Sequence, residues 1–482
     1  MLSRVIVYSS RPLVSMSFLV PPDPFINVSR AMSSPPIISV SPPSHLTFTP
    51  DIDVVSRLDE LKKNLGHTSS TDQWTVGGEA FKQLFTSSTS DQKTALLHHL
   101  SASFAVDKPS LDAAIAVYQR NNSATHEIRR ASTPLYQLLF QSVGNRFGGV
   151  KCICDLRAHL LSVLEEKNDV GLRRVEESAK ELLTMWFCLS NLTLERLTWQ
   201  SPADILHKVA KYEAVHPVAG ITDLRRRVGA GRRCFLFTHE AMPREPLVVV
   251  HVALVRSIAD NLQEILKADD EERMEDEHAD TAIYYSISST QKGLAGIDLG
   301  NLLIKGVVEE LERDQPKVKT HSTLSPIPGF RAWVLRSLHG NSEFGEIVDE
   351  GIVKLMKKEF GGSVDKEEAT TILLEILSTA RLQTTHIERV KGILMRLCAV
   401  YLLKAKRNGW ALNAVANFHV RNGAEVHRLN WAADSSPRGM ERSFGMMVNY
   451  KYNLESVHHN SEQYTARKDI AVHPQVSHLL ND

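Results

Sequence analysis

Residues 282–330 constrain the fold more than any other stretch of this 482-residue chain. They open with a short run, 282–288, that is rich in β-branched and aromatic residues and is typical of a buried strand. Two glycines follow, Gly293 and Gly296, which allow the backbone to turn sharply and to expose its N–H groups. An apolar stripe then predicts a helix, and a second strand is predicted before the loop 324–330. The helical stripe consists of Leu294, Ile297, Ile304, Val308 and Leu311.

A glycine turn at the start of a helix suits an anion. It points unpaired N–H groups and the positive end of the helix dipole outward, where a pyrophosphate can bind. On spacing alone, a tight connection without a ligand remains the alternative. The segment contains neither Gly-x-x-x-x-Gly-Lys-Ser/Thr nor Gly-x-Gly-x-x-Gly, so neither ATP nor a dinucleotide is indicated.

Composition excludes several classes of function. Lys+Arg and Asp+Glu both number 56, so the whole chain has no basic excess that would favour nucleic acid. It contains no run of about 18 apolar residues, so no membrane span is expected. Five cysteines in so long a chain indicate a reducing compartment rather than a disulfide framework. Cys152 and Cys154 form a lone Cys-x-Cys, which is too little for tetrahedral zinc, and no metal site is predicted.

The first fifty residues are typical of a targeting peptide followed by a linker. Residues 1–20 contain basic, serine and apolar residues and no acidic residue, which is the composition of an organelle transit peptide. Prolines between 35 and 43 favour a disordered spacer, and an unstructured tail with a basic bias is the alternative. We expect a mitochondrial matrix protein, with Met16 or Met32 as internal starts that would give a cytosolic form. Residues 478–482 are not a peroxisomal signal of the Ser-Lys-Leu type.

Two further regions are expected, 51–191 and 192–482. The first is helical almost throughout and predicts a bundle for support or oligomerisation, with no convergent catalytic group. Its stripes are Leu156, Leu160, Leu161 and Leu164, and then Val175, Ala179, Leu182, Leu183 and Trp186. In the second, strand-like runs at 234–237 and 246–252 alternate with helices and predict a mixed α/β layer.

Charged runs in the second region favour solvated surfaces. Eight of the twelve residues in 269–280 are acidic, so we expect a loop and not a metal site. The basic clusters are Arg225, Arg226 and Arg227, and then Arg232 and Arg233. They could meet phosphates, but a solvated face is the favoured interpretation.

The end of the chain predicts helices over 367–377 and 387–404 and then strands. Residues 413–420 and 425–431 are interpreted as strands joined by a hairpin, because Asn422-Gly423 is a strong turn signal. His419 would then lie at the end of the first strand. Residues 445–452 predict another strand.

Four motifs in this order resemble the malonyl-CoA decarboxylase family. They are Tyr285-Ser-Ile-Ser, Gly293-Leu-Ala-Gly-Ile-Asp-Leu-Gly300, Leu324-Ser-Pro-Ile-Pro-Gly-Phe330 and Asn413-Ala-Val-Ala-Asn-Phe-His419. The resemblance is strong from about 194 to 452 and looser before that. It implies an α+β protein, with an N-terminal all-α helical bundle domain followed by a GNAT-like (acetyltransferase-like) mixed α/β catalytic domain.

The resemblance also implies site residues. His419 matches the family's catalytic histidine and is the candidate proton donor, and Ser325 matches its catalytic serine, which we expect to act through hydrogen bonds. Ser286, Asp298 and Tyr452 match polar positions of the same pocket. The segment that matches the coenzyme A-binding backbone is Ala295, Gly296, Ile297, Asp298, Leu299, Gly300 and Asn301. Related enzymes carry Glu at position 298 and usually proline at 414, where this chain has Asp298 and Ala414.

The implied reaction is the decarboxylation of malonyl-CoA to acetyl-CoA. It passes through an enolate, so it needs donors that hold the oxyanion and an acid that protonates carbon. A thioester already stabilises the adjacent carbanion, so no cofactor is expected beyond the coenzyme A of the substrate. The family forms tetramers, which implies a homo-oligomer. An acyltransferase on the same fold and a non-catalytic acyl-CoA-binding protein are the alternatives.

Overall fold

The structure is a computed structural model that describes residues 54–66, 71–121, 125–267, 278–340, 346–361, 363–378 and 388–481. The predicted address at 1–50 and most of the acidic run at 269–280 lie outside the described residues. Among the residues that are described, no helix has the length and apolar character needed to cross a bilayer.

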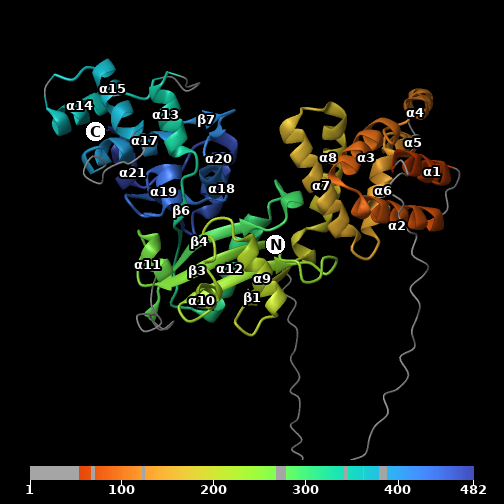
Figure 1. Cartoon of the computed structure of the whole chain (residues 1–482), viewed down its shortest axis with the longest axis horizontal. Coiled ribbons are helices and arrows are strands. Elements are labelled where there is room, and N and C mark those ends of the chain that lie inside the picture. Colours follow the sequence, from red (N-terminus) through yellow and green to blue (C-terminus); the bar gives the residue numbers. More distant parts are fainter. Residues whose placement is uncertain are drawn as a thin grey trace, which may run out of the picture. The chain divides into compact units, whose positions relative to one another are not determined.

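The first region is helical, as predicted (Figure 1). Its helices are α1 (Val54–Gly66), α2 (Thr71–Ser87), α3 (Ser90–Ser103), α4 (Lys108–Arg120), α5 (Thr125–Ala131), α6 (Leu135–Gly144), α7 (Gly149–Glu166) and α8 (Val170–Trp186). Leu156 and Leu160 of α7 and Val175 and Leu182 of α8 are buried, so the predicted stripes form the core. This core also buries Cys152 among its apolar side chains, and burial raises the pKa of its thiol to about 11.

An eight-stranded sheet dominates the second region, in the order β1-β2-β3-β4-β5-β10-β6, with β9 paired to β10. Its strands are β1 (Thr193–Leu197), β2 (Arg232–Thr238), β3 (Val248–Val255), β4 (Thr281–Ser289), β5 (Thr320–Thr323), β6 (Ser325–Pro326), β9 (Glu425–Asn430) and β10 (Met447–Tyr452). Among the described strands of this sheet, β4 and β5 are the pair that runs parallel, and α12 (Leu299–Asp314) connects them. The predicted strand, glycine turn, helix and strand are therefore all present, although Leu294 lies in the turn η3 (Lys292–Leu294) ahead of the helix.

The sheet opens beyond Tyr284. Strands β4 and β5 pair from Thr281–Thr320 to Tyr284–Thr323, and there the parallel pairing ends. Strand β4 continues to Ser289, whereas the chain after β5 forms β6 and pairs with β10. Strands β4 and β6 thus separate, and side chains from both line the space between them.

The remaining helices and short strands come between or after the strands of this sheet in the chain (Figure 1). Two short helices, α9 (Ala203–Tyr212) and α10 (Ile221–Arg227), precede β2, and α11 (Leu262–Lys267) follows β3. After β6 come α13 (Phe330–Leu338), α14 (Glu350–Phe360), α15 (Lys366–Ser378), α17 (Lys391–Leu403), β7 (Lys406–Arg407), β8 (Trp410–Ala411), α18 (Ala414–Arg421), α19 (Pro437–Ser443), α20 (Val457–Arg467) and α21 (Pro474–Asn481).

The hairpin predicted through Asn422-Gly423 is wrong, because residues 414–421 form helix α18. The side chain of Asn413 accepts a hydrogen bond from the N–H of Ala416 and caps the helix start. At the other end, the N–H of Gly423 bonds to the carbonyl of Val420 and the N–H of Ala424 to that of His419. These two bonds are a Schellman cap, which needs a left-handed residue just as a hairpin turn does. Gly423 supplies it, with φ of 83°.

The basic clusters are only in part the solvated face that we favoured, because Arg225 is exposed and Arg226 is half-buried but the other three arginines are not. Arg227, Arg232 and Arg233 are buried. The Arg227 guanidinium pairs with the Asp223 carboxylate at 2.9 Å and donates to backbone carbonyls. Arg225 lies over the ring of Trp199, 6.0 Å from its centroid, beside a separate surface cavity. These arginines hold β2 and the preceding helix in place.

Candidate active site

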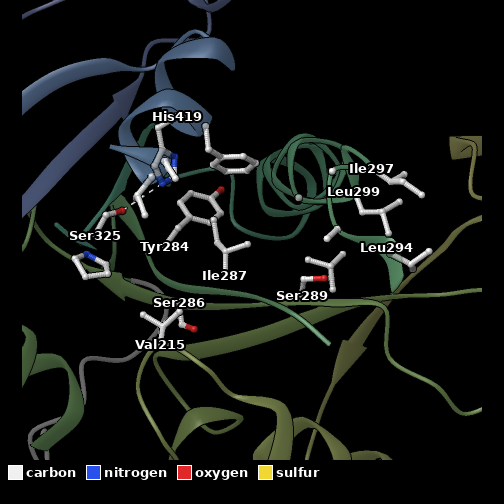
Figure 2. Close-up of a pocket in the computed structure, with 18 of the residues that line it drawn as sticks. Val215, Tyr284, Ser286, Ile287, Ser289, Leu294, Ile297, Leu299, Ser325 and His419 are labelled. Carbon is white, nitrogen blue, oxygen red and sulfur yellow. Dashed lines mark hydrogen bonds between the residues drawn. The ribbon is translucent and has the colours of Figure 1, made fainter. Parts of the chain in front are cut away.

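A cavity of about 350 Å3 lies where β4 and β6 separate. The N-terminal half of α18 forms one wall, and the turn before α12 with the first residues of α12 forms another (Figure 2). Most of its lining is apolar, including Ile287, Leu294, Leu299 and Phe418. Its polar members include Tyr284, Ser286, Ser289, Ser325 and His419.

Ser325 and His419 meet at one side of this cavity, although 94 residues separate them in the chain. The Ser325 Oγ lies 3.3 Å from the His419 Nε2, and Figure 2 shows the two side chains pointing toward one another. Pairing of Ser325 with Val448 of β10 fixes the serine. His419 lies in the last turn of α18, whose start is tied to the loop before α13, because the Asn413 amide donates to the Pro328 carbonyl.

Two tyrosines define the state of the imidazole. The ring of His419 stacks on that of Tyr450, with centroids 4.5 Å apart and planes at 21°. Its Nδ1 lies 2.8 Å from the Tyr452 hydroxyl. Burial lowers the pKa of His419 to about 3 and raises the pKa of Tyr452, so at neutral pH the imidazole is uncharged and the phenol keeps its proton.

One pattern of donors satisfies all these groups. The Ser325 hydroxyl donates to the Thr323 Oγ1 at 2.9 Å, so its oxygen is left to accept from the Nε2–H of His419. The Nδ1 then accepts from the Tyr452 hydroxyl. In this arrangement the imidazole presents an N–H toward Ser325 and the cavity. Tyr452, which is not in the cavity lining, fixes that tautomer from behind.

The glycine turn and the start of α12 form the other side of the cavity. Of the predicted segment 295–301, Ala295, Gly296, Ile297, Leu299 and Gly300 line it. The Asp298 side chain is exposed and does not line the cavity, and neither does Asn301, whose amide donates to the Asp298 carboxylate at 3.3 Å. The N–H groups of Gly300 and Asn301 have no backbone acceptor among the residues that the structure describes.

Two positions of this segment, 296 and 300, favour glycine for steric reasons. Gly296 has φ of 75°, which a residue with a side chain rarely adopts. A Cβ at Gly300 would lie 3.0 Å from the Phe418 ring, which is tighter than an ordinary contact, so any larger residue would require that ring to shift. A Cβ at Gly296 would lie 3.6 Å from the Lys180 Nζ, which places this cation of α8 beside the turn.

The helical region also contacts the glycine turn, through residues of α7. The buried guanidinium of Arg157 donates to the carbonyl of Gly293 and pairs with the Glu176 carboxylate at 2.7 Å. A Cβ at Gly293 would overlap the carbonyl oxygen of Cys154, so α7 packs directly on the turn. Sequence reasoning placed no residue of this region near the site.

A buried charged pair beneath the cavity was also missed. The Ser286 hydroxyl donates to both carboxylate oxygens of Glu213, at 2.7 and 2.9 Å, and the His251 Nε2 lies 3.4 Å from that carboxylate. Burial disfavours the charge on Glu213, but the hydrogen bond and the charge of His251 outweigh it and hold the pKa of Glu213 well below its ordinary value. Ser286 therefore lines the cavity as predicted, with its proton committed to Glu213. No local sequence pattern marks this pair.

Family models match both regions of the chain. The model described as "Malonyl-CoA decarboxylase C-terminal domain" matches residues 190–482, and that of the "Malonyl-CoA decarboxylase N-terminal domain" matches residues 104–187. The chain is 43% identical over 360 residues to the mitochondrial malonyl-CoA decarboxylase of Anser anser anser, covering 73% of this chain and 71% of the relative. It is 40% identical over 407 residues to that of Rattus norvegicus, covering 81% and 82%.

Solved structures show the same likeness. The malonyl-CoA decarboxylase of Rhodopseudomonas palustris matches with a TM-score of 0.77 and 34% identity, covering 88% of this chain and 98% of the other. That of Agrobacterium vitis matches with a TM-score of 0.75 and 33% identity, covering 89% and 100%. The predicted α+β fold, with a helical N-terminal region and a GNAT-like mixed α/β region, is confirmed.

Proposed function

The chain belongs to the malonyl-CoA decarboxylase family, and from this we infer that it converts malonyl-CoA to acetyl-CoA and carbon dioxide. The observation that carries the mechanism is the Ser325–His419 pair, which closes one side of a mostly apolar cavity. The opposite wall is the start of α12, where an anion would be favoured. The acyl group and the phosphates of one substrate molecule can therefore be held at two ends of one cavity.

We propose that the phosphates of coenzyme A bind at the glycine turn. The free N–H groups of Gly300 and Asn301 and the helix dipole favour negative charge there. The Lys180 ammonium beside Gly296 adds a full positive charge from the helical region. Asp298 acts through its backbone in this proposal, because its side chain does not line the cavity.

The pantetheine arm then follows β4. Beyond Tyr284 this strand has lost β5, so one edge of residues 285–289 faces the cavity without a strand partner. The two amide groups of pantetheine match the hydrogen-bonding groups of such an edge. Ser286 and Ile287 lie in this stretch and line the path toward Ser325. The arm thereby delivers the malonyl group to the Ser325–His419 pair.

Loss of carbon dioxide is promoted by the surroundings of the carboxylate. The mainly apolar lining strips water from the malonyl carboxylate, which favours the neutral product. The electron pair left behind spreads onto the thioester oxygen, and the Nε2–H of His419 is the donor placed to hold it. One such donor typically contributes about 3 kcal/mol.

The enolate must then receive one proton, which the reaction consumes. A malonyl carboxylate next to His419 raises the pKa of the imidazole, so the histidine takes up a proton as the substrate binds. After carbon dioxide leaves, the carboxylate charge is gone and the imidazolium passes its Nε2 proton to the α-carbon. The histidine is then neutral with its remaining proton on Nδ1, and proton exchange with solvent returns the Nε2–H tautomer, whose pKa is low. The scheme needs no cofactor beyond the substrate's own thioester.

The test follows the coenzyme A esters by mass spectrometry after incubation with malonyl-CoA. We expect one acetyl-CoA and one carbon dioxide for each malonyl-CoA consumed. The variant His419→Ala should lose about 10²–10⁴-fold in kcat, whereas the exposed His459→Ala should not. Acyl transfer to an amine without carbon dioxide, or tight binding without turnover, would contradict the proposed reaction. Full activity in His419→Ala would remove the mechanism.

Three relatives carry the word mitochondrial in their names, which supports a mitochondrial location for this chain. We propose that residues 1–50 contain the matrix address. The cytosolic form from an internal start and the homotetramer also stay predictions. Import of a reporter fused to residues 1–50 tests the address, and light scattering of the purified protein tests the assembly.

A further inference from the structure

Three metal-ligating side chains gather outside the cavity, on β9 and on the segment that precedes α21. They are Glu425 and His427 of β9 and His473, and their candidate ligand atoms all lie within 4.8 Å of one another. The proposed reaction uses none of them. His427 and His473 are 46 positions apart in the chain, so their proximity is a property of the fold.

The backbone fixes all three side chains. The register of β9 against β10 shifts between Val426 and Arg428, and at this irregularity the side chains of Glu425 and His427 meet, with the His427 Nδ1 3.1 Å from the Glu425 Oε1. Val426 between them forms a parallel bridge with Val472, in which the Val426 N–H donates to the Ala471 carbonyl at 2.9 Å. The His473 N–H donates back to the Val426 carbonyl at 3.0 Å. The third side chain is thus held against the other two before any ion binds.

We propose that Glu425, His427 and His473 bind a divalent transition-metal ion of the zinc class, with water as the remaining ligand. Two imidazoles and one carboxylate are a ligand set that zinc accepts in proteins. Ligand atoms at zinc distances lie about 3.3 Å apart in a tetrahedral site. The His427 Nδ1 and the Glu425 Oε1 are already 3.1 Å apart, and the ring centroids of His427 and His473 are 4.6 Å apart.

The electrostatics allow an ion to enter. All three residues are half-buried, so solvent reaches them. Lys451 pairs with Glu425 across the strands, and its charge opposes the ion. The Glu425 carboxylate offsets that charge, which predicts moderate affinity.

The position predicts a structural role. An ion here would join β9 to the segment that leads into α21, which packs against α17 and β9. The same strand starts directly after Ala424, whose N–H donates to the His419 carbonyl. Binding would therefore stabilise the C-terminal segment and the end of α18, without contact with the substrate cavity.

The test uses the full chain, stripped of metal with a chelator and titrated with Zn²⁺ by calorimetry. We expect one ion per chain, and His427→Gln and His473→Gln each to weaken binding by at least about tenfold. The variant His459→Gln, on the exposed part of α20, is the matched control and should bind as the wild type does. Co²⁺ in place of Zn²⁺ should give the intense visible absorption of a four-coordinate site in the wild type alone.

Two outcomes would overturn the proposal. One is equal Zn²⁺ binding in the wild type and in the double variant of His427 and His473, and the other is no binding in the stripped wild type. Decarboxylase activity of each variant serves as the check on folding, because these residues lie outside the cavity. Melting curves add an independent readout, since Zn²⁺ should raise the Tm of the wild type and leave that of His473→Gln unchanged.

Discussion

Tyr452→Phe tests whether a residue behind the histidine controls the reaction. The change removes one hydroxyl and keeps the ring. That hydroxyl lies 2.8 Å from the Nδ1 of His419 and is outside the cavity lining. Tyr452 is therefore a positioning residue in the proposed mechanism, because it acts on the substrate only through the imidazole.

The size of the effect follows from the buried hydrogen bond. Without the hydroxyl, the Nδ1 of His419 is a buried acceptor without a partner, which costs about 1–3 kcal/mol. The neutral histidine can avoid this cost by moving its proton to Nδ1, but the imidazolium that the reaction requires always carries a proton on Nδ1, and that buried N–H would then have no acceptor. With about 1.4 kcal/mol for each tenfold change, we expect kcat to fall by about tenfold. KM should stay within about twofold, because the lining is intact.

Tyr450→Phe is the matched control. Tyr450 stacks on the same imidazole, and its hydroxyl is buried without a hydrogen-bond partner among the described residues. Removing that hydroxyl keeps the stacking and relieves an unsatisfied polar group, so kcat should be retained and the Tm should not fall.

Steady-state assays of carbon dioxide release across pH 5.5–8.5 separate the possible roles of Tyr452. A raised KM with an unchanged kcat would mean that Tyr452 contacts the substrate instead of orienting His419. Equal rates in Tyr452→Phe and the wild type at every pH would refute the proposed tautomer. A loss of kcat as large in Tyr450→Phe as in Tyr452→Phe would show that the effect is one of packing.

Three further predictions follow. Lys180→Ala should raise KM for malonyl-CoA about tenfold with little change in kcat, and Lys180→Arg should retain most of the affinity, as measured by initial rates. Ala414→Pro should raise the Tm by about 1–3 °C in thermal melts, because position 414 is the first residue of α18, where proline is well tolerated. Burial lowers the pKa of His321 to about 4 and of His419 to about 3, so below pH 6.5 the unfolded chain binds protons that the folded chain does not. The free energy of unfolding should therefore fall from pH 6.5 toward pH 4, by about 1.4 kcal/mol per pH unit for each histidine, in urea titrations.

The strand, glycine turn and helix at 281–314 could be predicted because each signal is local. A β-branched run, glycines at a left-handed position and a 3.6-residue period all act within a few residues. The helix at 414–421 was missed because Asn-Gly is ambiguous. A glycine with positive φ ends a helix as readily as it turns a hairpin, and the capping role of Asn413 decides between them.

The site shows the same limit. The resemblance pointed to Ser325 and His419, and the structure brings them within hydrogen-bonding distance. The resemblance gave no reason to expect that Ser286 bonds to a buried Glu213. It also gave no reason to expect that Tyr452 contacts the imidazole from outside the cavity lining. Such relations depend on which side chains the fold buries together, and no spacing in the sequence encodes them. The charge of Glu213 is tolerated only because partners 38 and 73 positions away surround it.

The two departures from the family pattern are explained by where they lie. Asp298 has an exposed side chain and makes no capping bond to α12, so losing one methylene relative to Glu removes no contact with the cavity. Ala414 starts a helix, so the missing proline costs rigidity in the unfolded chain and no hydrogen bond in the folded one. Asp298 lies outside the cavity lining, and Ala414 lines the cavity with a side chain of a single methyl group.

The helical region contributes directly to the site, because its helices α7 and α8 contact the glycine turn. The Gly293 carbonyl is held by the guanidinium of Arg157, and α7 leaves no room for a side chain at that position. The Lys180 ammonium lies beside Gly296, where the phosphates are proposed to bind. A glycine-rich turn alone loses more conformational entropy on ordering than any other segment of its length. Because contacts from α7 and α8 order the turn in the absence of substrate, we expect part of the substrate affinity to originate in the helical region.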